Sequence, residues 1–146
     1  MKAKARERHE GIIFEISVPS DIFNELYNDF LSELGVNTTR TFAVDCHGET
    51  LVIARNQAGE ISGIASFFAP NQFLHVLYVL PRARRTQVGT ELLKIIQKKY
   101  GTVFRLKCLA SNKSARAFYL ALGFEVVGGG TNEDGDYETL EINNPI

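Results

Sequence analysis

Hydrophobic residues recur in two spacings along the first part of the chain. Residues 11–18 are rich in Ile, Val and Phe, which is typical of a β-strand, and Pro19 ends this run. Ser20 is a favourable N-cap for a following helix. From there, apolar side chains recur every three or four residues, at Ile22, Phe23, Leu26, Phe30, Leu31 and Leu34. This spacing predicts an amphipathic helix that ends at Gly35.

The middle of the chain is dominated by β-prone runs. Strands are expected at residues 41–44, 51–55, 61–68 and 73–80. The segment 45–49 separates the first two of these runs and is turn-like. The run at 73–80, FLHVLYVL, is apolar at nearly every position, which is typical of a strand covered on both faces. We therefore expect it at the centre of a sheet, ending at Pro81.

The second half alternates helical and extended patterns. Apolar residues at helical spacing predict helices over residues 88–100 and 112–122, each stopped by a glycine. Between and after them, strands are expected at residues 103–109, 124–127 and 137–142. The segment 128–135, rich in Gly, Asn and Asp, is typical of a flexible loop.

This order of elements predicts one domain of the α/β (α+β) class. We expect a mixed central sheet of six to seven strands with helices on both faces. The domain would span residues 11–146, after a charged N-terminal tail at residues 1–10. A length of 146 residues suits a single domain of ordinary size.

Composition narrows the class of protein further. The chain is 45% hydrophobic and 23% charged, with a net charge of −1, as in ordinary globular proteins. The near-zero charge argues against a dedicated nucleic-acid binder. No apolar run reaches the roughly 18 residues of a membrane span, and no hydrophobic leader follows the basic start. We therefore expect a cytoplasmic protein with no membrane partner.

A candidate anion site follows the central strand. The strand ends at Pro81, and a loop carrying Arg82, Arg84 and Arg85 leads into the helix at residue 88. Unpaired N–H groups and the helix dipole at such a helix start suit a phosphate. The alternative is a solvated loop with surface arginines. Dinucleotide-binding and P-loop fingerprints are absent from the sequence.

Two motifs resemble those of the GNAT superfamily of N-acetyltransferases. The first is Leu77-Tyr78-Val79-Leu80-Pro81 followed by Arg84-x-x-Gln87-x-Gly89-Thr90, which resembles the acetyl-CoA motif of the family. The second is Asn112-x-x-Ala115-x-x-Phe118-Tyr119-x-x-Leu122-Gly123-Phe124. Their order and spacing fit a GNAT-like fold. Gln87 departs from the family pattern, which usually has a glycine that lets the backbone approach the pyrophosphate.

The resemblance implies acetyl-CoA as cosubstrate and a role for each matching residue. Backbone groups of Leu77 and Val79 would pair with the pantetheine arm. The pyrophosphate would be held by backbone N–H groups of the loop and helix start, at Arg84, Arg85, Gln87, Val88, Gly89 and Thr90. Asn112 would contact the cofactor through its side chain, and Tyr119 would lie near the sulfur.

Acyl transfer to an amine requires groups that move protons. An aliphatic amine is protonated at neutral pH, and the thioester must release a thiolate. Tyr119 is the candidate acid toward the sulfur, and Val79 N–H is a candidate donor to the thioester oxygen. His75 shares a strand face with Leu77 and is the candidate base. The alternatives are a core aromatic at Tyr119 and a hydrogen-bonded structural histidine at His75, with water or backbone carbonyls as the base.

The sequence leaves alternatives open for the acceptor molecule and for whether the protein is an enzyme. Acidic residues at Glu133, Asp134 and Asp136 would favour a cationic amine, or form only a soluble turn. The short chain favours a small-molecule amine or amino-acid-like acceptor over a protein amine. A homodimer is compatible with the resemblance. The rivals to an enzyme are a non-catalytic GNAT-like module that binds CoA or senses a ligand, and an interaction protein with basic helix ends.

The cysteines predict neither disulfides nor a metal centre. Cys46 and His47 are adjacent, but further ligands at metal-binding spacing are missing, so we expect them in an exposed turn. Cys108 falls within a predicted strand and is expected in the core. The sequence therefore predicts no metal site.

Overall fold

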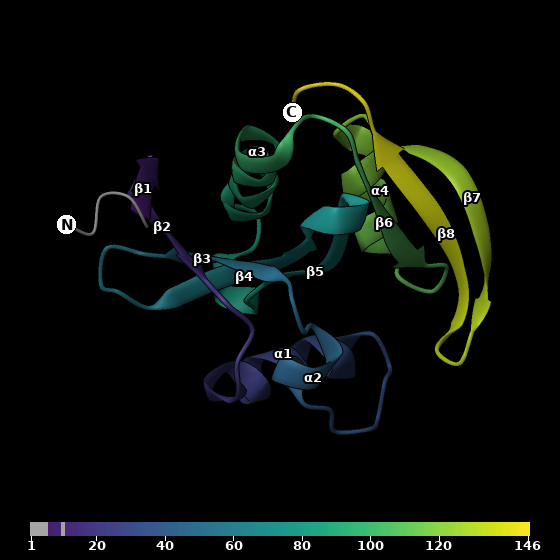
Figure 1. The fold of residues 1–146 in the computed structure, drawn as a ribbon, viewed down its shortest axis with the longest axis horizontal. Helices are drawn as coiled ribbons and strands as arrows, with labels where there is room; N and C mark the ends of the chain where they lie inside the picture. The colour runs from purple at the N-terminus through teal and green to yellow at the C-terminus, as the bar shows by residue number, and fades with distance from the viewer. Residues whose placement is uncertain (1–5, 10) are drawn as a thin grey trace.

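An eight-stranded mixed sheet runs through the protein, in the order β1-β2-β3-β4-β5-β6-β8-β7 (Figure 1). The computed structural model describes residues 6–9 and 11–146. The strands are β1 (Arg6–His9), β2 (Ile12–Ser17), β3 (Thr50–Arg55), β4 (Ile61–Phe68), β5 (Phe73–Val79), β6 (Phe104–Leu109), β7 (Glu125–Asn132) and β8 (Gly135–Ile142). Among these described strands, only β5 and β6 pair in parallel. The predicted α/β (α+β) class with a mixed sheet is confirmed.

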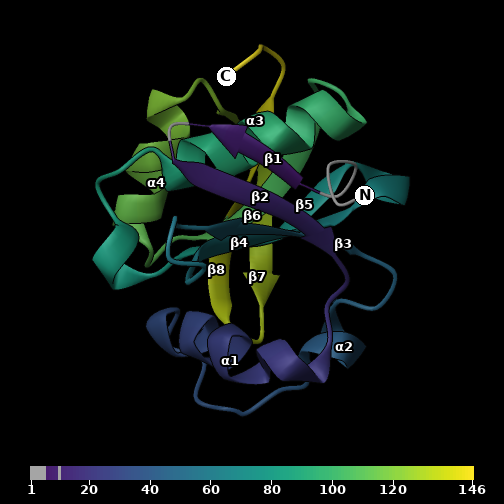
Figure 2. The same ribbon diagram turned by 90° about the vertical axis from the view of Figure 1, so that its left-hand side faces the viewer.

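Helices cover both faces of the sheet (Figure 2). On one face lie α1 (Asn24–Glu33), preceded by the 3-10 turn η2 (Asp21–Phe23), and the short α2 (Phe42–Asp45). On the other lie α3 (Val88–Tyr100) and α4 (Lys113–Ala121). Each face has its own core cluster, and alternate residues of β3 feed the two. Because both faces of the central strands contact apolar side chains, polar and apolar residues do not alternate along these strands.

Strand β1 adds an edge strand in the segment expected as a charged tail. Residues 6–9 pair antiparallel with β2, from Arg6 opposite Glu15 to His9 opposite Ile12. With this strand, the described part of the chain contributes eight strands to the sheet, where six to seven were expected.

The strand predicted at residues 41–44 is wrong, because this segment forms α2. The Asn24 side chain accepts the Phe42 N–H at 2.8 Å, and the Phe42 ring stacks on Tyr27 with centroids 4.6 Å apart. Packing against α1 therefore overrides the β propensity of Thr, Phe and Val.

The flexible loop expected at residues 128–135 is mostly strand β7. The glycines serve close packing here: a Cβ on Gly129 would lie 2.8 Å from Tyr137 O, and one on Gly130 would lie 2.8 Å from Tyr137 Oη. Neither position could accept a side chain without moving its neighbour. The turn itself is confined to the residues between β7 and β8.

The sheet divides at β5 and β6. These strands pair only through Phe73 opposite Arg105 and Leu74 opposite Leu106, and then diverge. At the same level the pairing of β4 with β5 shifts register, because Ser66 faces Val76 while Phe67 faces Leu74. His75 is the extra residue of this β-bulge. The bulge thus places His75 where the two strands separate.

No helix in the described part of the chain is both long and apolar enough to cross a membrane.

Candidate active site

A cleft of about 460 Å³ begins where β5 leaves β6 and ends at the loop before α3. We call it the loop cleft. Most residues predicted to bind the cofactor line it: Leu77, Val79, Arg84, Arg85, Gly89, Asn112 and Tyr119. Gln87 and Val88 line a neighbouring hollow instead, and Thr90 lies in the first turn of α3. Most of the remaining wall comes from α1 and α4, and Tyr78, Ala83 and Thr86 complete it.

The β5 edge presents backbone groups to the loop cleft. Leu80 N–H donates to Ser62 O at 2.9 Å, so it faces β4. Because backbone groups alternate sides along a strand, the N–H groups of Leu77 and Val79 face away from β4. Strand β6 has already diverged at this level. Two N–H groups, one on each of these residues, are therefore directed toward the gap.

The loop before α3 shows how Gln87 takes the position where the family usually has a glycine. The backbone of Gln87 has φ −90° and ψ 8°, which any residue can adopt, whereas Arg85 carries the left-handed conformation with φ 62°. The Gln87 side chain is exposed. Thr86 Oγ1 donates to Ala83 O at 2.5 Å and fixes the loop. Replacing the usual glycine by Gln87 thus costs no backbone strain.

Gly89 is needed for close packing at the beginning of α3. A Cβ at this position would lie 3.3 Å from Phe118 Cζ and 3.5 Å from Val79 Cγ2. Gly89 is itself buried, and it lines the loop cleft between β5 and α4. The first N–H groups of this helix have no partner within the helix and suit an anion.

Arg84 connects the loop to α1. Its Nε donates to Val79 O at 2.9 Å, and its Nη2 pairs with Glu33 Oε1 at 2.6 Å. Arg82 donates to Ile61 O and so points toward β4. Of the three arginines, Arg84 and Arg85 line the loop cleft.

A second cavity of about 270 Å³ lies at the other end of the β5–β6 gap. We call it the His75 pocket. It shares a wall with the loop cleft, formed by Phe30, Leu34, Leu77, Asn112, Ala115 and Tyr119. Its own lining includes His75, Arg40, Lys107 and Asp134. Two cavities therefore meet at one group of side chains, which is what a reaction between two substrates requires.

Tyr119 lies at this junction with its ring buried between Phe118 and Phe124, at centroid distances of 5.4 and 5.2 Å. Burial, with a smaller contribution from Cys108, raises the pKa of the Tyr119 phenol well above its usual value. The hydroxyl is therefore protonated throughout the physiological range and can donate a hydrogen bond. Tyr119 is thus a core aromatic that also lines both cavities, and its role as a proton donor stays a prediction.

Asn112 caps α4 and faces both cavities. Its Oδ1 accepts the Ala115 N–H at 3.3 Å, which leaves the side-chain NH2 group for a ligand. The cap fixes the side chain at the wall that the loop cleft and the His75 pocket share.

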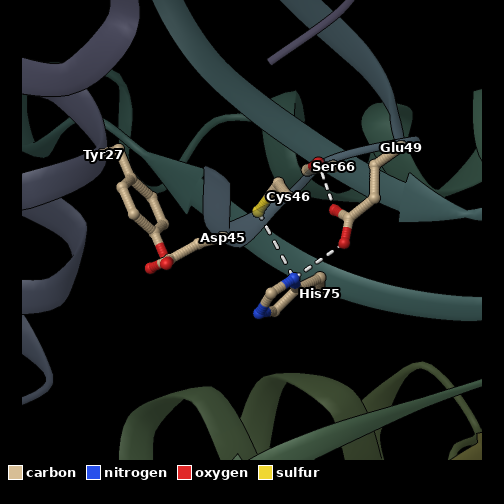
Figure 3. A network of polar contacts seen from close by, with 6 residues as sticks. All are labelled: Tyr27, Asp45, Cys46, Glu49, Ser66 and His75. Atoms are coloured by element: carbon tan, nitrogen blue, oxygen red, sulfur yellow. Dashed lines mark hydrogen bonds and ion pairs between the residues drawn. The ribbon is translucent and has the colours of Figure 1, made fainter. Parts of the chain in front are cut away.

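His75 belongs to a polar cluster at the bulge (Figure 3). Its Nδ1 lies 2.8 Å from Glu49 Oε2, and Ser66 Oγ donates to Glu49 Oε1 at 2.5 Å. Nδ1 also lies 3.3 Å from Cys46 Sγ. An Nδ1–H bond to the Glu49 carboxylate leaves the lone pair on Nε2, and Nε2 points away from Glu49 and Cys46.

Cys46 and Glu49 were not identified as site residues from the sequence. Cys46 is fully buried, not exposed, while His47 is exposed. Burial, and next the charge of Glu49, raise the pKa of the Cys46 thiol, so it is protonated and is not an activated nucleophile. Cys46 and Glu49 precede His75 by 29 and 26 residues, a spacing that carries no local signal.

The acidic turn between β7 and β8 contributes one residue to the His75 pocket. Arg40 Nη2 lies 3.5 Å from Asp134 Oδ1 and 3.7 Å from Glu133 Oε1. Asp134 and Arg40 line the pocket, whereas Glu133 is largely exposed. Asp136 accepts a hydrogen bond from Thr131 Oγ1 at 2.6 Å. The pocket mouth therefore carries both signs of charge.

A family model described as the acetyltransferase (GNAT) domain matches residues 19–136. The chain therefore belongs to the GNAT superfamily of acetyltransferases, as its two motifs, divided sheet and paired cavities suggest. It is an acetyltransferase by family, and the resemblance noted in the sequence is confirmed. No curated protein sequence matches the chain.

Solved GNAT structures share this fold at low sequence identity. An acetyltransferase from Staphylococcus aureus Mu50 is 17% identical with a TM-score of 0.64, over 89% of this chain and 98% of that one. The self-immunity acetyltransferase MccE, in complex with acetyl-CoA and AMP, is 14% identical, with a TM-score of 0.62 over 94% of each chain. Spermidine N-acetyltransferase from Vibrio cholerae, with CoA and spermine, is 9% identical, with a TM-score of 0.64 over 88% and 94%.

Proposed function

We propose that the protein transfers an acetyl group from acetyl-CoA to a primary amine by direct attack on the thioester. The observation that carries this proposal is the meeting of the loop cleft and the His75 pocket at Leu77 and Tyr119. A donor in one cavity and an acceptor in the other would then react across this shared wall without a covalent enzyme intermediate.

The lining of the loop cleft supports acetyl-CoA as the donor. The pyrophosphate would bind the N–H groups at the start of α3, beside Arg85 and over Gly89. The pantetheine arm would pair with the backbone of Leu77 and Val79, which face the gap. The side-chain amide of Asn112 would bond to the arm from the opposite wall. The acyl sulfur would then lie near Tyr119.

The proposed chemistry uses one group on each side of the thioester. Glu49 holds the Nδ1–H tautomer of His75, and Nε2 takes the proton of the attacking amine. The amine nitrogen forms a bond to the acyl carbon, and Val79 N–H stabilises the charge on the carbonyl oxygen. The C–S bond breaks, and Tyr119 Oη donates to the departing thiolate. Its raised pKa makes Tyr119 a hydrogen-bond donor to the sulfur rather than a strong acid.

The His75 pocket favours a small acceptor over a protein amine. Its volume of about 270 Å³ is below the usual range for drug-sized ligands. Asp134 offers a negative partner for a cationic amine, and Arg40 and Lys107 offer positive partners for a carboxylate. An amino-acid-like amine matches both. The spermidine acetyltransferase among the structural neighbours acts on a small amine.

The alternative of a non-catalytic CoA-binding module rests on Gln87. Because the Gln87 backbone is unstrained and its side chain is exposed, this residue gives no reason to prefer a module without activity.

Titration calorimetry with acetyl-CoA, followed by a thiol-release assay on a panel of amines and amino acids, tests the proposal. We expect saturable binding and release of CoA thiol with at least one small amine. Absence of binding would overturn the proposal. Binding without thiol release on any amine would favour the ligand-sensing module.

A further inference from the structure

Three side chains with metal-binding chemistry converge beside the His75 pocket (Figure 3). Cys46 comes from the end of α2, Glu49 from the residue before β3, and His75 from the bulge of β5. One potential ligand atom of each lies within 4.8 Å of the other two. Cys46 is fully buried and the Glu49 side chain is only 7% exposed, so both are held in place.

Two groups of the cluster face the same nitrogen atom. Nδ1 of His75 contacts both Glu49 Oε2 at 2.8 Å and Cys46 Sγ at 3.3 Å. A neutral ring nitrogen carries either one hydrogen or one lone pair, so it can bond well with only one of these groups. A cation between the three atoms would satisfy a thiolate, a carboxylate and an imidazole lone pair together.

We propose that Cys46, Glu49 and His75 form a binding site for a zinc-class divalent transition metal. Bond lengths of 2.0–2.3 Å place two ligands of one zinc ion roughly 3–4 Å apart. The distances from His75 Nδ1 to Glu49 Oε2 and Cys46 Sγ, 2.8 and 3.3 Å, lie near this range. A mixed sulfur, nitrogen and oxygen set suits this class of metal. Three protein ligands leave a fourth position for water.

The surroundings of the three ligands fit the same role. Ser66 Oγ holds the second oxygen of Glu49 at 2.5 Å, as outer hydrogen bonds orient carboxylate ligands in metal sites. On binding, the Cys46 thiol releases its proton to solvent, and the metal ion exchanges bound waters for the protein ligands. The oxidation state of every atom is unchanged.

The proposed metal would switch off the proposed base. A metal bound to Nδ1 leaves the ring hydrogen on Nε2, and Nε2 then cannot accept the amine proton. Glu49 would thus orient His75 for catalysis in the metal-free protein and hold the metal in the bound one. This consequence, unlike the binding itself, rests on the proposed function.

Titration of the untagged, reduced protein with Co²⁺ tests the site without any substrate. We expect one equivalent to bind, with d–d bands and a thiolate-to-cobalt charge-transfer band, and Zn²⁺ to displace it. Cys46→Ser should abolish the charge-transfer band, whereas Cys108→Ser, a matched buried thiol outside the cluster, should retain it. Absence of the band in the wild-type protein, or its loss only in Cys108→Ser, would overturn the proposal.

A second variant tests the site even if Cys46→Ser fails to fold. Ser66→Ala keeps all three ligands and should weaken Zn²⁺ binding by about 10–100-fold, with a folded circular dichroism spectrum. Unchanged Zn²⁺ affinity in this variant would contradict the outer-sphere role of Ser66. In the thiol-release assay, Zn²⁺ should inhibit with the affinity measured by titration. Tight binding without inhibition would refute the switch while leaving the metal site.

Discussion

Glu49 Oε2 lies 2.8 Å from His75 Nδ1, and the carboxylate is 7% exposed while the imidazole is 40% exposed. A buried acceptor therefore fixes one nitrogen of a ring whose other nitrogen remains accessible. This arrangement separates an orienting residue, Glu49, from the residue that would contact the acceptor, His75. The separation can be tested by substituting each residue.

Glu49→Gln should lower kcat with little effect on the KM for acetyl-CoA, because a glutamine can also donate to Nδ1 and so permits the wrong tautomer. His75→Ala should lose about 100-fold or more in kcat, as expected for removal of a general base, and Glu49→Gln should lose less. His47→Asn, at the neighbouring exposed histidine, is the control and should be unaffected. Full kcat in His75→Ala would show that water or a backbone carbonyl is the base.

Tyr119→Phe should lower kcat more than it weakens acetyl-CoA binding, because only the hydroxyl is removed. Tyr100→Phe is a matched control outside both cavities: it loses the 2.6 Å bond to Thr50 Oγ1 and should cost about 1 kcal/mol of stability without changing kcat. Steady-state kinetics and thermal melts separate the two effects. Wild-type turnover in Tyr119→Phe would eliminate the donor role.

Gln87→Gly should change the acetyl-CoA dissociation constant little, because the Gln87 side chain does not line the loop cleft and its backbone is unstrained. Gly89→Val should weaken binding about 10-fold or more, because its Cβ alone would lie 3.3 Å from Phe118 Cζ and its methyl groups would move the start of α3. The overpacking should also lower stability by about 1–3 kcal/mol. Calorimetry on both variants gives the constants. Marked weakening in Gln87→Gly would instead identify its amide as a phosphate ligand.

The ion pair that anchors α4 to β8 should make stability depend on pH. Arg116 Nε lies 2.5 Å from Glu138 Oε1, and this hydrogen bond holds the pKa of Glu138 below its usual value. A carboxyl with a depressed pKa stabilises the fold above its unfolded pKa, and this contribution disappears as pH falls through the folded value.

Arg116→Gln should therefore have a slightly lower Tm than the wild type at neutral pH, with the gap closing below about pH 4. The effect is small because both groups are partly exposed, and added salt should reduce it. Lys113→Gln, on the same helix, serves as control. A gap that persists at low pH would indicate loss of packing rather than of charge.

The sequence predicted correctly those helices and strands whose conformation is determined by residues close together in the chain. The apolar run of β5, the glycine stop of α3 and the Asn112 cap of α4 all depend on residues within a few positions. The segments 41–44 and 128–135 were misread because their conformation depends on distant partners, Tyr27 and Tyr137. Propensity cannot reveal such tertiary contacts.

The candidate site likewise contains residues marked by local motifs and residues brought together only by the fold. The loop-cleft residues on β5, the following loop and α4 belong to two contiguous motifs, so the sequence could indicate them, whereas the α1 residues that complete the cleft carry no such signal. The Cys46–Glu49–His75 cluster comes from three elements, and a one-residue bulge brings them together. Nothing in a single sequence marks that bulge, so His75 was identified without either of its partners.

The two residue pairs that join β5 to β6 also bear on folding. Among the described strands, these two pairs are the only pairing between the five N-terminal strands, β1 to β5, and the three C-terminal strands, β6, β8 and β7. Parallel pairing across an intervening helix is slow to form, because its loop-closure entropy must be overcome before few bonds are gained. Amide protons of these two pairs should accordingly exchange with solvent sooner than those inside either group of strands, and should gain protection when a ligand bridges both groups.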